Sequence, residues 1–237
     1  MKRKISILTV CVMLLAIITT GFSQTRFQAG LNLKLGFPQS EFKENVDNVG
    51  IGGAGHFGYN IPQSPFYVGA GMGFIIYGSD TREEPFSTTI PDVYVDVTTT
   101  NSIFNGHLLF RVQPQEGFLR PYLDGMLGFN YLSTSTEIKD QHSWGEDDEI
   151  ASTTNQDDFA SSYGGGGGLM IQVYEGFTEN NSLYEIFVDI GIKYLKGGEA
   201  EYLKEGSITR KNNKVFYDLN KSTTDLLNFH IGASINF

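Results

Sequence analysis

The sequence predicts an all-β protein, an eight-stranded antiparallel up-and-down transmembrane β-barrel. Apolar and polar residues alternate with period two over runs of roughly ten residues, the pattern of strands that cross a membrane. The 237 residues include 28 Gly, 18 Phe and 12 Tyr, an excess that favours strands and close backbone contacts. A mean hydropathy of −0.17 is too polar for a bundle of membrane helices but compatible with a barrel, whose strands average polar and apolar residues.

The first 23 residues predict a signal peptide that is not part of the fold. Lys2, Arg3 and Lys4 form a basic start, and an apolar run follows at residues 5–18. Small residues then surround Phe22, which places the cleavage site after Ser23. The run is too short to span a bilayer as a mature helix. We therefore expect one domain, an outer-membrane β-barrel over residues 24–237.

Composition excludes two classes of function for this expected mature chain. The only cysteine, Cys11, lies in the signal peptide, so we expect neither disulfides nor thiol catalysis. Removing the three basic residues at positions 2–4 leaves 14 basic against 27 acidic residues, a net charge of −13. A strongly acidic exported protein is a poor binder of nucleic acid, so no nucleic-acid partner is expected.

Eight alternating runs define the expected strands. In chain order they occupy residues 27–37, 49–59, 66–76, 104–112, 123–131, 163–173, 184–194 and 227–237. In every run the apolar residues share one face, which we expect to contact lipid. The opposite face is glycine-rich in the second, third and sixth runs and polar in most of the others. Because no backbone group can remain unpaired in hydrocarbon, the sheet is expected to close.

The connections between the runs alternate in length. Short turns are expected at residues 61–65, 113–117 and 175–182, and the longest loops at 78–92, 133–160 and 195–224. Short turns on one side and long loops on the other are typical of outer-membrane barrels. The turns and both mature termini are therefore expected in the periplasm, and the long loops outside the cell.

The polar face of the runs predicts a charged lumen. Its ionisable members are Lys34, Arg111, Asp124, Glu185, Asp189, Lys193, His56, His107 and His230. An eight-stranded barrel is just wide enough to be filled by side chains, and buried charges must pair. Three basic and three acidic residues predict a lumen plugged by ion pairs; a narrow polar conduit is the alternative. The histidines are expected to be hydrogen-bonded, with metal ligands or catalytic groups as the alternative.

Two glycine motifs suggest nucleotide sites, but their context does not support that function. Gly50-x-Gly52-x-x-Gly55 matches a dinucleotide fingerprint, yet it lies inside a period-two run with no helix after it. Gly164 to Gly168 lacks the Lys-Ser/Thr sequence of a phosphate-binding loop. Both are interpreted as glycine-rich strands, and no cofactor is expected.

The long connections differ in charge. The segment 133–160 is acidic, and it is expected to be a solvated loop, with a divalent-cation contact as the alternative. The segment 195–224 is locally basic and is expected to lie near the acidic loop or anionic headgroups. Aromatic residues at run ends predict two interfacial girdles formed by Phe37, Tyr59, Phe66, Tyr77, Tyr131, Tyr174, Tyr184, Tyr194 and Phe237.

Three features together resemble the small OmpX/OmpA-like outer-membrane β-barrel proteins over residues 24–237. They are the signal peptide, the eight amphipathic runs and the terminal run ending at Phe237. A terminal Phe after alternating apolar residues is similar to the assembly signal that such barrels present to the insertion machinery. The segment Arg120-Pro121-Tyr122-Leu123-Asp124-Gly125 resembles a strand of Bacteroidota-type outer-membrane barrel domains, as does Gln24 after the cleavage site.

The expected function follows from this architecture. We expect a non-enzymatic barrel in the outer membrane of a Gram-negative bacterium, with surface loops that contact a partner, a ligand or the envelope. The expected partners are outer-membrane lipid, the insertion machinery and a possible surface protein or ligand. A small channel for ions or polar solutes is the alternative, and a lipid-modifying or proteolytic barrel enzyme comes third. A soluble lipocalin-like barrel would need an apolar interior, which the lumenal charges contradict.

Overall fold

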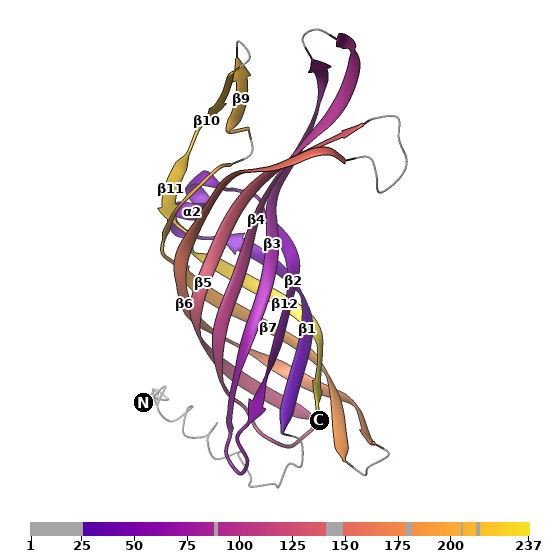
Figure 1. The fold of residues 1–237 in the computed structure, drawn as a ribbon. Helices are drawn as coiled ribbons and strands as arrows, with labels where there is room; N and C mark the ends of the chain where they lie inside the picture. The colour runs from indigo at the N-terminus through magenta and orange to yellow at the C-terminus, as the bar shows by residue number, and fades with distance from the viewer. Residues whose placement is uncertain (1–25, 88–89, 141–148, 179–181, 205, 212–213) are drawn as a thin grey trace, which may run out of the picture.

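The computed structural model describes residues 26–87, 90–140, 149–178, 182–204, 206–211 and 214–237. Its core is a closed antiparallel barrel of eight strands (Figure 1). The barrel strands are β1 (Phe27–Pro38), β2 (Gly50–Asn60), β3 (Phe66–Ser87), β4 (Ile90–Val112), β5 (Leu119–Asp140), β6 (Glu149–Phe177), β7 (Leu183–Gly197) and β12 (Leu226–Asn236). They form a ring in which β12 closes on β1. The predicted fold class is confirmed. The predicted signal peptide lies outside the described residues.

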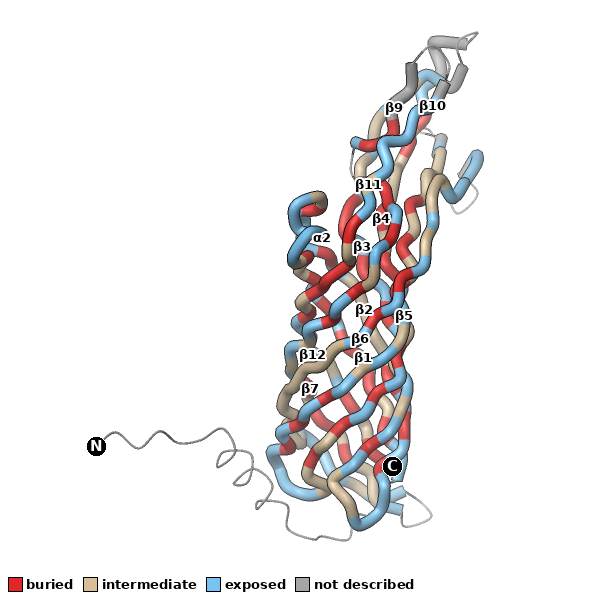
Figure 2. Tube along the Cα trace, turned by 90° about the vertical axis from the view of Figure 1, so that its left-hand side faces the viewer, coloured by how far each residue is buried: buried red, intermediate tan, exposed pale blue. Residues whose placement is uncertain are grey.

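Each strand alternates between buried and exposed residues, and the burial pattern is that of an inside-out protein. In β1 the odd-numbered Leu31 and Leu33 are 77% and 72% exposed, whereas Asn32 and Lys34 between them are buried. The same alternation runs around the whole barrel in Figure 2. Because successive side chains of a strand point to opposite faces, the apolar set covers the outside and the polar set fills the inside.

Two of the predicted loops are wrong: residues 78–92 and 133–160 largely continue the barrel strands. The β3–β4 ladder extends to the pair Ser87↔Ile90, and the β5–β6 ladder extends to Lys139↔Glu149. In Figure 1 both ribbons extend beyond the ring: the β3–β4 ribbon rises above it, and the β5–β6 ribbon bends out to the side. Outside hydrocarbon a strand needs no continuous apolar face, so the period-two signal weakens there, although Val95 and Val97 of β4 are still buried on one face. Thr and Ser still favour strands, and cross-strand pairs such as Thr81–Thr98, with hydroxyl oxygens 2.9 Å apart, support the ladder.

The predicted loop 195–224 is also partly wrong, because it contains four short strands. They are β8 (Glu199–Tyr202), β9 (Ile208–Lys211), β10 (Lys214–Tyr217) and β11 (Asn220–Thr223). β8 pairs with β11 near the rim, and β9 pairs with β10 in a hairpin that projects from it (Figure 1). Between β1 and β2 lies a short helix, α2 (Ser40–Asn45), that the sequence did not predict. No helix in the described part of the chain is long and apolar enough to cross a membrane.

The C-terminus and the start of β1 meet at the end of the barrel that lies opposite the ribbons. The amide of Phe237 donates to the carbonyl of Phe27 at 2.9 Å, and the ring of Phe27 lies 6.1 Å from that of Phe237. Aromatic pairs also mark the other boundary, where the rings of Tyr131 and Phe159 lie 4.6 Å apart. Tyr77 is the exception among the predicted girdle residues: it is buried inside, because it is out of phase with the outward-facing Ile76.

Both glycine motifs lie in strands, as the sequence predicted. Gly50, Gly52 and Gly55 belong to β2, and residues 164–168 belong to β6. The inward-facing Gly168 leaves the space that the Tyr122 hydroxyl occupies, since a Cβ at this position would collide with that oxygen and with the carbonyl of Ile190. The glycine run therefore makes room for a bulky lumenal side chain.

We predict that Gly168→Val displaces Tyr122 from its hydrogen bonds and destabilises the barrel by about 1–3 kcal/mol, the range for overpacking. Gly125→Ala is the matched control, because the nearest atom to an added Cβ there, the carbonyl oxygen of Phe110, lies 3.9 Å away. Urea unfolding of the barrel in lipid vesicles measures both variants. Equal stability of the two variants would show that Gly168 does not accommodate Tyr122.

Candidate functional site

The barrel lumen contains all nine of the predicted ionisable residues. Arg111 and Asp189 are completely buried, and Lys193 is the most accessible, with 18% of its side chain exposed. The others are buried residues on β1, β2, β4, β5, β7 and β12: Lys34, His56, His107, Asp124, Glu185 and His230. Strand alternation alone directs them inward, and closure of the ring brings them together.

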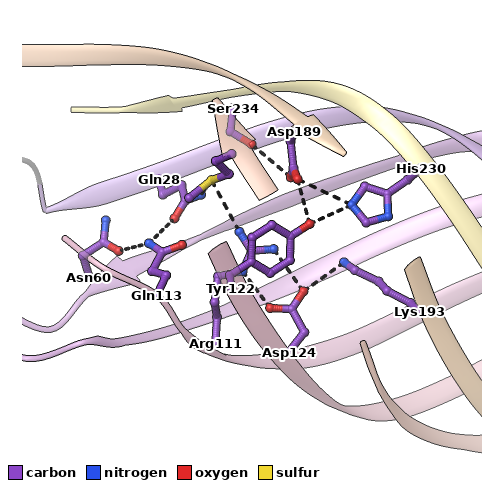
Figure 3. Close-up of polar contacts among 11 residues, drawn as sticks. Gln28, Asn60, Arg111, Gln113, Tyr122, Asp124, Asp189, Lys193, His230 and Ser234 are labelled. Carbon is purple, nitrogen blue, oxygen red and sulfur yellow. Dashed lines mark hydrogen bonds and ion pairs between the residues drawn. The ribbon is translucent and has the colours of Figure 1, made fainter. Parts of the chain in front are cut away.

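Arg111 and Asp124 form the central ion pair of the lumen (Figure 3). They occupy paired positions on β4 and β5, and the Nε and Nη2 groups of Arg111 donate to the two Asp124 oxygens at 2.7 and 3.0 Å. The Nζ of Lys193 lies 3.3 Å from Asp124 Oδ2. The Arg111 guanidinium also stacks on the Tyr122 ring, 3.7 Å from its centroid. Arginine suits this position because its planar group pairs with a carboxylate and packs on an aromatic face at once.

Asp189 is held by neutral donors and a histidine rather than by a lysine or arginine. The Tyr122 hydroxyl donates to Asp189 Oδ1 at 2.7 Å and lies 2.9 Å from His230 Nε2. His230 Nε2 lies 3.6 Å from Asp189 Oδ1, and the Ser234 hydroxyl donates to Oδ2 at 3.5 Å. Tyr122 crosses the lumen from β5 to reach β7 and β12 (Figure 3). The arrangement fixes one buried carboxylate with several hydrogen bonds.

The Arg111–Asp124 pair and the Asp189 group form two layers of lumenal contacts. A third layer lies toward the chain termini, and it contains a residue that the sequence did not predict. Arg120 forms an ion pair with Glu185, and its guanidinium lies 4.5 Å from the centroid of the Phe187 ring. Gln113 donates to Asn60 at 2.9 Å nearby. The signal for Arg120 was present, because it alternates in phase with Tyr122 and Asp124. The predicted balance of three basic and three acidic residues is therefore wrong: Arg120 makes four basic against three.

A fourth layer surrounds a cavity of about 60 Å³. Lys34, Lys193 and all three inward histidines contribute to its wall. The Nζ of Lys34 donates to Asn105 Oδ1 at 3.3 Å, and His107 Nε2 lies 3.0 Å from the Ser162 hydroxyl. The three histidines thus converge on one cavity. No group of three or more His, Cys, Asp or Glu side chains in the described part of the chain could hold a metal ion.

An apolar cluster lies between this cavity and the rim of the barrel. Phe42 of α2 is completely buried, and its ring lies 5.1 Å from the ring of Tyr202 on β8 and 5.6 Å from that of Tyr77 on β3. Burial raises the pKa of the Tyr202 hydroxyl, which lies 2.7 Å from the Ser222 hydroxyl. The other buried apolar members are Val46, Ile75, Ile103, Leu132, Ala160, Ala200 and Leu226.

The interior is therefore polar and the exterior apolar, on a ring of strands that closes on itself. This distribution is the reverse of that in a soluble barrel and meets the requirements for strands that cross lipid. The chain has the architecture of a small outer-membrane β-barrel. The predicted alternative of a lipocalin-like barrel is excluded by the same observation.

No family model and no curated protein matches the chain. Several solved structures are similar to this barrel. Neisserial surface protein A is 11% identical, with a TM-score of 0.37 and coverage of 91% of this chain and 97% of its own. Ail of Yersinia pestis, solved in complex with the heparin analogue sucrose octasulfate, is 12% identical, with a TM-score of 0.34 and coverage of 90% and 97%. A major outer membrane protein from Thermus thermophilus is 12% identical, with a TM-score of 0.35 and coverage of 89% and 99%.

The segment 195–224 meets β6 at the rim, where two of its backbone amides donate to a carboxylate and to a carbonyl of β6. Asp158 of β6 accepts a hydrogen bond from the amide of Glu201 at 2.8 Å, and the amide of Gly198 donates to the carbonyl of Ser161 at 2.7 Å. The segment 195–224 thus packs beside the upper part of β6. This contact joins Glu201 and Asp158, two acidic residues, so it does not rest on the opposite charges from which the position was predicted. The acidic residues at 141–148 lie outside the described residues, so the divalent-cation alternative stays a prediction.

Proposed function

We propose that this chain is an integral outer-membrane protein with a plugged lumen, which carries stiff surface projections for contact with a partner or ligand. Outer-membrane lipid surrounds the barrel, the short turns and the termini face the periplasm, and the ribbons face outward. The single observation that carries the proposal is that the outward-facing residues of each long strand change from apolar to polar along its length. The outward residues are apolar from Phe66 to Ile76 in β3, about the length needed to span a bilayer.

Beyond that belt the outward side chains become polar while the ladder continues. Ser102, Ser133 and Ser135 occupy the positions that follow Phe104 and Tyr131 on the outer face. A flexible loop would have sufficed to join these strands. Extended ladders instead hold their tips at a fixed distance from the membrane, which favours contact over simple closure.

The β9–β10 hairpin adds an exposed apolar surface to these projections. Val215, Phe216 and Tyr217 of β10 and Leu219 after it are about half exposed, at 50%, 53%, 47% and 48%. Aromatic residues that stand clear of the membrane are typical of protein contact surfaces. The chemistry fits a partner with an apolar patch. A non-enzymatic role is part of the proposal, because the three lumenal carboxylates, Asp124, Glu185 and Asp189, are each engaged by an ion pair or by hydrogen bonds.

Two groups of buried side chains, one on each side of the cavity, support the plugged lumen over a channel for ions or polar solutes. The Phe42 cluster lies at the rim, and the Arg111, Tyr122 and Arg120 layers lie between the cavity and the termini. Planar-bilayer recordings of the folded barrel test this point. We expect no discrete conductance steps. Reproducible steps from folded protein would favour the channel instead.

Shortened ribbons test the contact function. The positions Glu137 and Ser152 are paired, as are Thr81 and Thr98, so the residues beyond each pair can be replaced by an Asn-Gly turn without a register shift. We expect both shortened barrels to insert like the full-length protein and to lose binding on an array of immobilised glycans and envelope proteins. Replacing the turn at residues 61–65, at the other end, is the matched control. Failure of the shortened barrels to insert, or unchanged binding, would contradict the proposal.

A further inference from the structure

The lumenal cavity carries more positive than negative charge in its surroundings. The charged groups of the lumen that are buried or nearly buried are four basic residues, Lys34, Arg111, Arg120 and Lys193, and three acidic residues, Asp124, Glu185 and Asp189. A fourth buried carboxylate, Asp225, lies at the rim, where the hydroxyls of Ser40 and Tyr194 and the amide of Gly197 donate to it. Each carboxylate already has its own cation or set of hydrogen bonds. An unbalanced buried charge is costly, so a counter-ion is expected where the imbalance is located.

The imbalance is located at Lys34. Asp124 is engaged by Arg111 and Lys193, and Glu185 by Arg120. Within the described residues, the only hydrogen bond of the Lys34 ammonium is to the neutral Asn105 amide oxygen, at 3.3 Å. An ammonium group has three protons to donate, so at least two of those of Lys34 remain available.

Several other buried polar groups around the same cavity are unpartnered. Within the described part of the chain, the side-chain amide nitrogens of Asn105 and Asn228 have no hydrogen-bond acceptor, and neither does Nε2 of His56. These residues are 4%, 2% and 8% exposed, and all three belong to the cavity wall together with Lys34 and Lys193. Two amide oxygens on the same wall, those of Asn32 and Asn228, also have no partner among the described residues. With the available protons of Lys34, the unpartnered donors outnumber these acceptors, and this excess of donors indicates a bound acceptor.

We propose that the cavity binds a small inorganic anion of halide size between Lys34 and Lys193. The two ammonium groups supply charge, and the amides of Asn105 and Asn228 supply neutral donors. A volume of about 60 Å³ has room for about two waters at roughly 30 Å³ each, so it accepts one halide with a water. The ion would act as a structural counter-ion that completes the plug, and the site would exist whether or not the surface projections bind a partner.

Refolding in matched salts tests the site. The barrel is folded into lipid vesicles separately in sodium chloride and in sodium gluconate, whose anion is too large for the cavity, at equal ionic strength. Urea unfolding then gives the stability in each salt. At a chloride concentration ten times its dissociation constant, the unfolding equilibrium constant should fall about 11-fold relative to gluconate.

Lys34→Met should abolish this chloride dependence and raise the stability in gluconate, because it removes the uncompensated charge. Lys221→Met is the matched control, since Lys221 is an exposed lysine of β11, with 59% of its side chain accessible. It should retain the full chloride effect. Crystals grown in bromide should show an anomalous peak between Lys34 and Lys193.

Equal wild-type stability in the two salts, with no bromide peak, would overturn the proposal and leave a cavity filled by water alone. A chloride effect that persists in Lys34→Met would place the anion elsewhere and overturn it as well. Neither outcome depends on conductance or on surface binding, so the anion site and the proposed function fail independently.

Discussion

Arg111→Met should destabilise the folded barrel by about 3–5 kcal/mol, the cost of leaving a buried charge without its partner. The side chains of Arg111 and Asp124 are both completely inaccessible to solvent. Without Arg111, Asp124 retains only Lys193, whose Nζ lies 3.3 Å away. The variant also loses the guanidinium that stacks on Tyr122. Urea unfolding in lipid vesicles, followed by the gel shift between folded and unfolded barrel, measures the loss.

Two further variants separate the ion pair from the packing. In Arg111→Met with Asp124→Leu no carboxylate is stranded, so the double variant should be more stable than Arg111→Met alone. Lys221→Met removes one partner of an exposed pair, Lys221–Glu199, whose atoms lie 3.7 Å apart. It should change stability by no more than about 0.5 kcal/mol. A double variant less stable than the single one would show that the pairing of Asp124 with Lys193 outweighs the cost of the buried carboxylate.

The sequence predicted the direction of each lumenal side chain because that direction is a property of the strand. Alternation places Lys34, Asp124 and Asp189 inside whatever their partners are. The Arg111–Asp124 pair was also within reach of sequence reasoning, since both lie on one hairpin. Arg120 was missed because the alternating apolar residues of β5 were recognised only from Leu123 onward. Its position, two and four residues before the inward-facing Tyr122 and Asp124, already placed it on the inner face.

Contacts across the lumen could not be predicted from the sequence. Tyr122 of β5 reaches Asp189 of β7 and His230 of β12, and this depends on the barrel diameter and on the space left by Gly168. The cavity at Lys34 depends in the same way on what the opposite wall contributes. The ribbons were missed because their apolar face is short: Val95 and Val97 of β4 are buried, but most other positions of the ribbons carry polar residues, so the period-two signal is weak there.

The apolar plug was missed for a different reason, and it leads to the second large prediction. Phe42 lies in a connection that has no periodicity, yet it is the completely buried centre of the cluster at the rim. Phe42→Ala should cost about 3–5 kcal/mol locally, as for other buried aromatic residues. The eight-stranded ladder does not depend on α2, so we expect α2 to detach while the barrel stays folded.

Hydrogen exchange measures the detachment directly. The amide of Val46, which donates to the carbonyl of Phe42 at 2.8 Å, should lose its protection, whereas β1 and β2 amides keep theirs. Phe216→Ala is the matched control, because Phe216 is a 53% exposed aromatic residue of the β10 strand. It should leave exchange at residues 40–46 unchanged. Unfolding of the whole barrel in Phe42→Ala would show instead that the plug and the ladder form one cooperative unit.

Removing the plug should also expose the chamber below it without opening a pore. A cysteine at Ile103, a completely buried member of the Phe42 cluster, should react slowly with a water-soluble thiol reagent when Phe42 is present and much faster when it is combined with Phe42→Ala. Conductance should remain absent, because the Arg111–Tyr122 and Arg120–Phe187 layers still fill the barrel on the other side of the cavity. Fast labelling together with conductance steps would show that the Phe42 cluster is the seal, and that the polar layers conduct once it is gone.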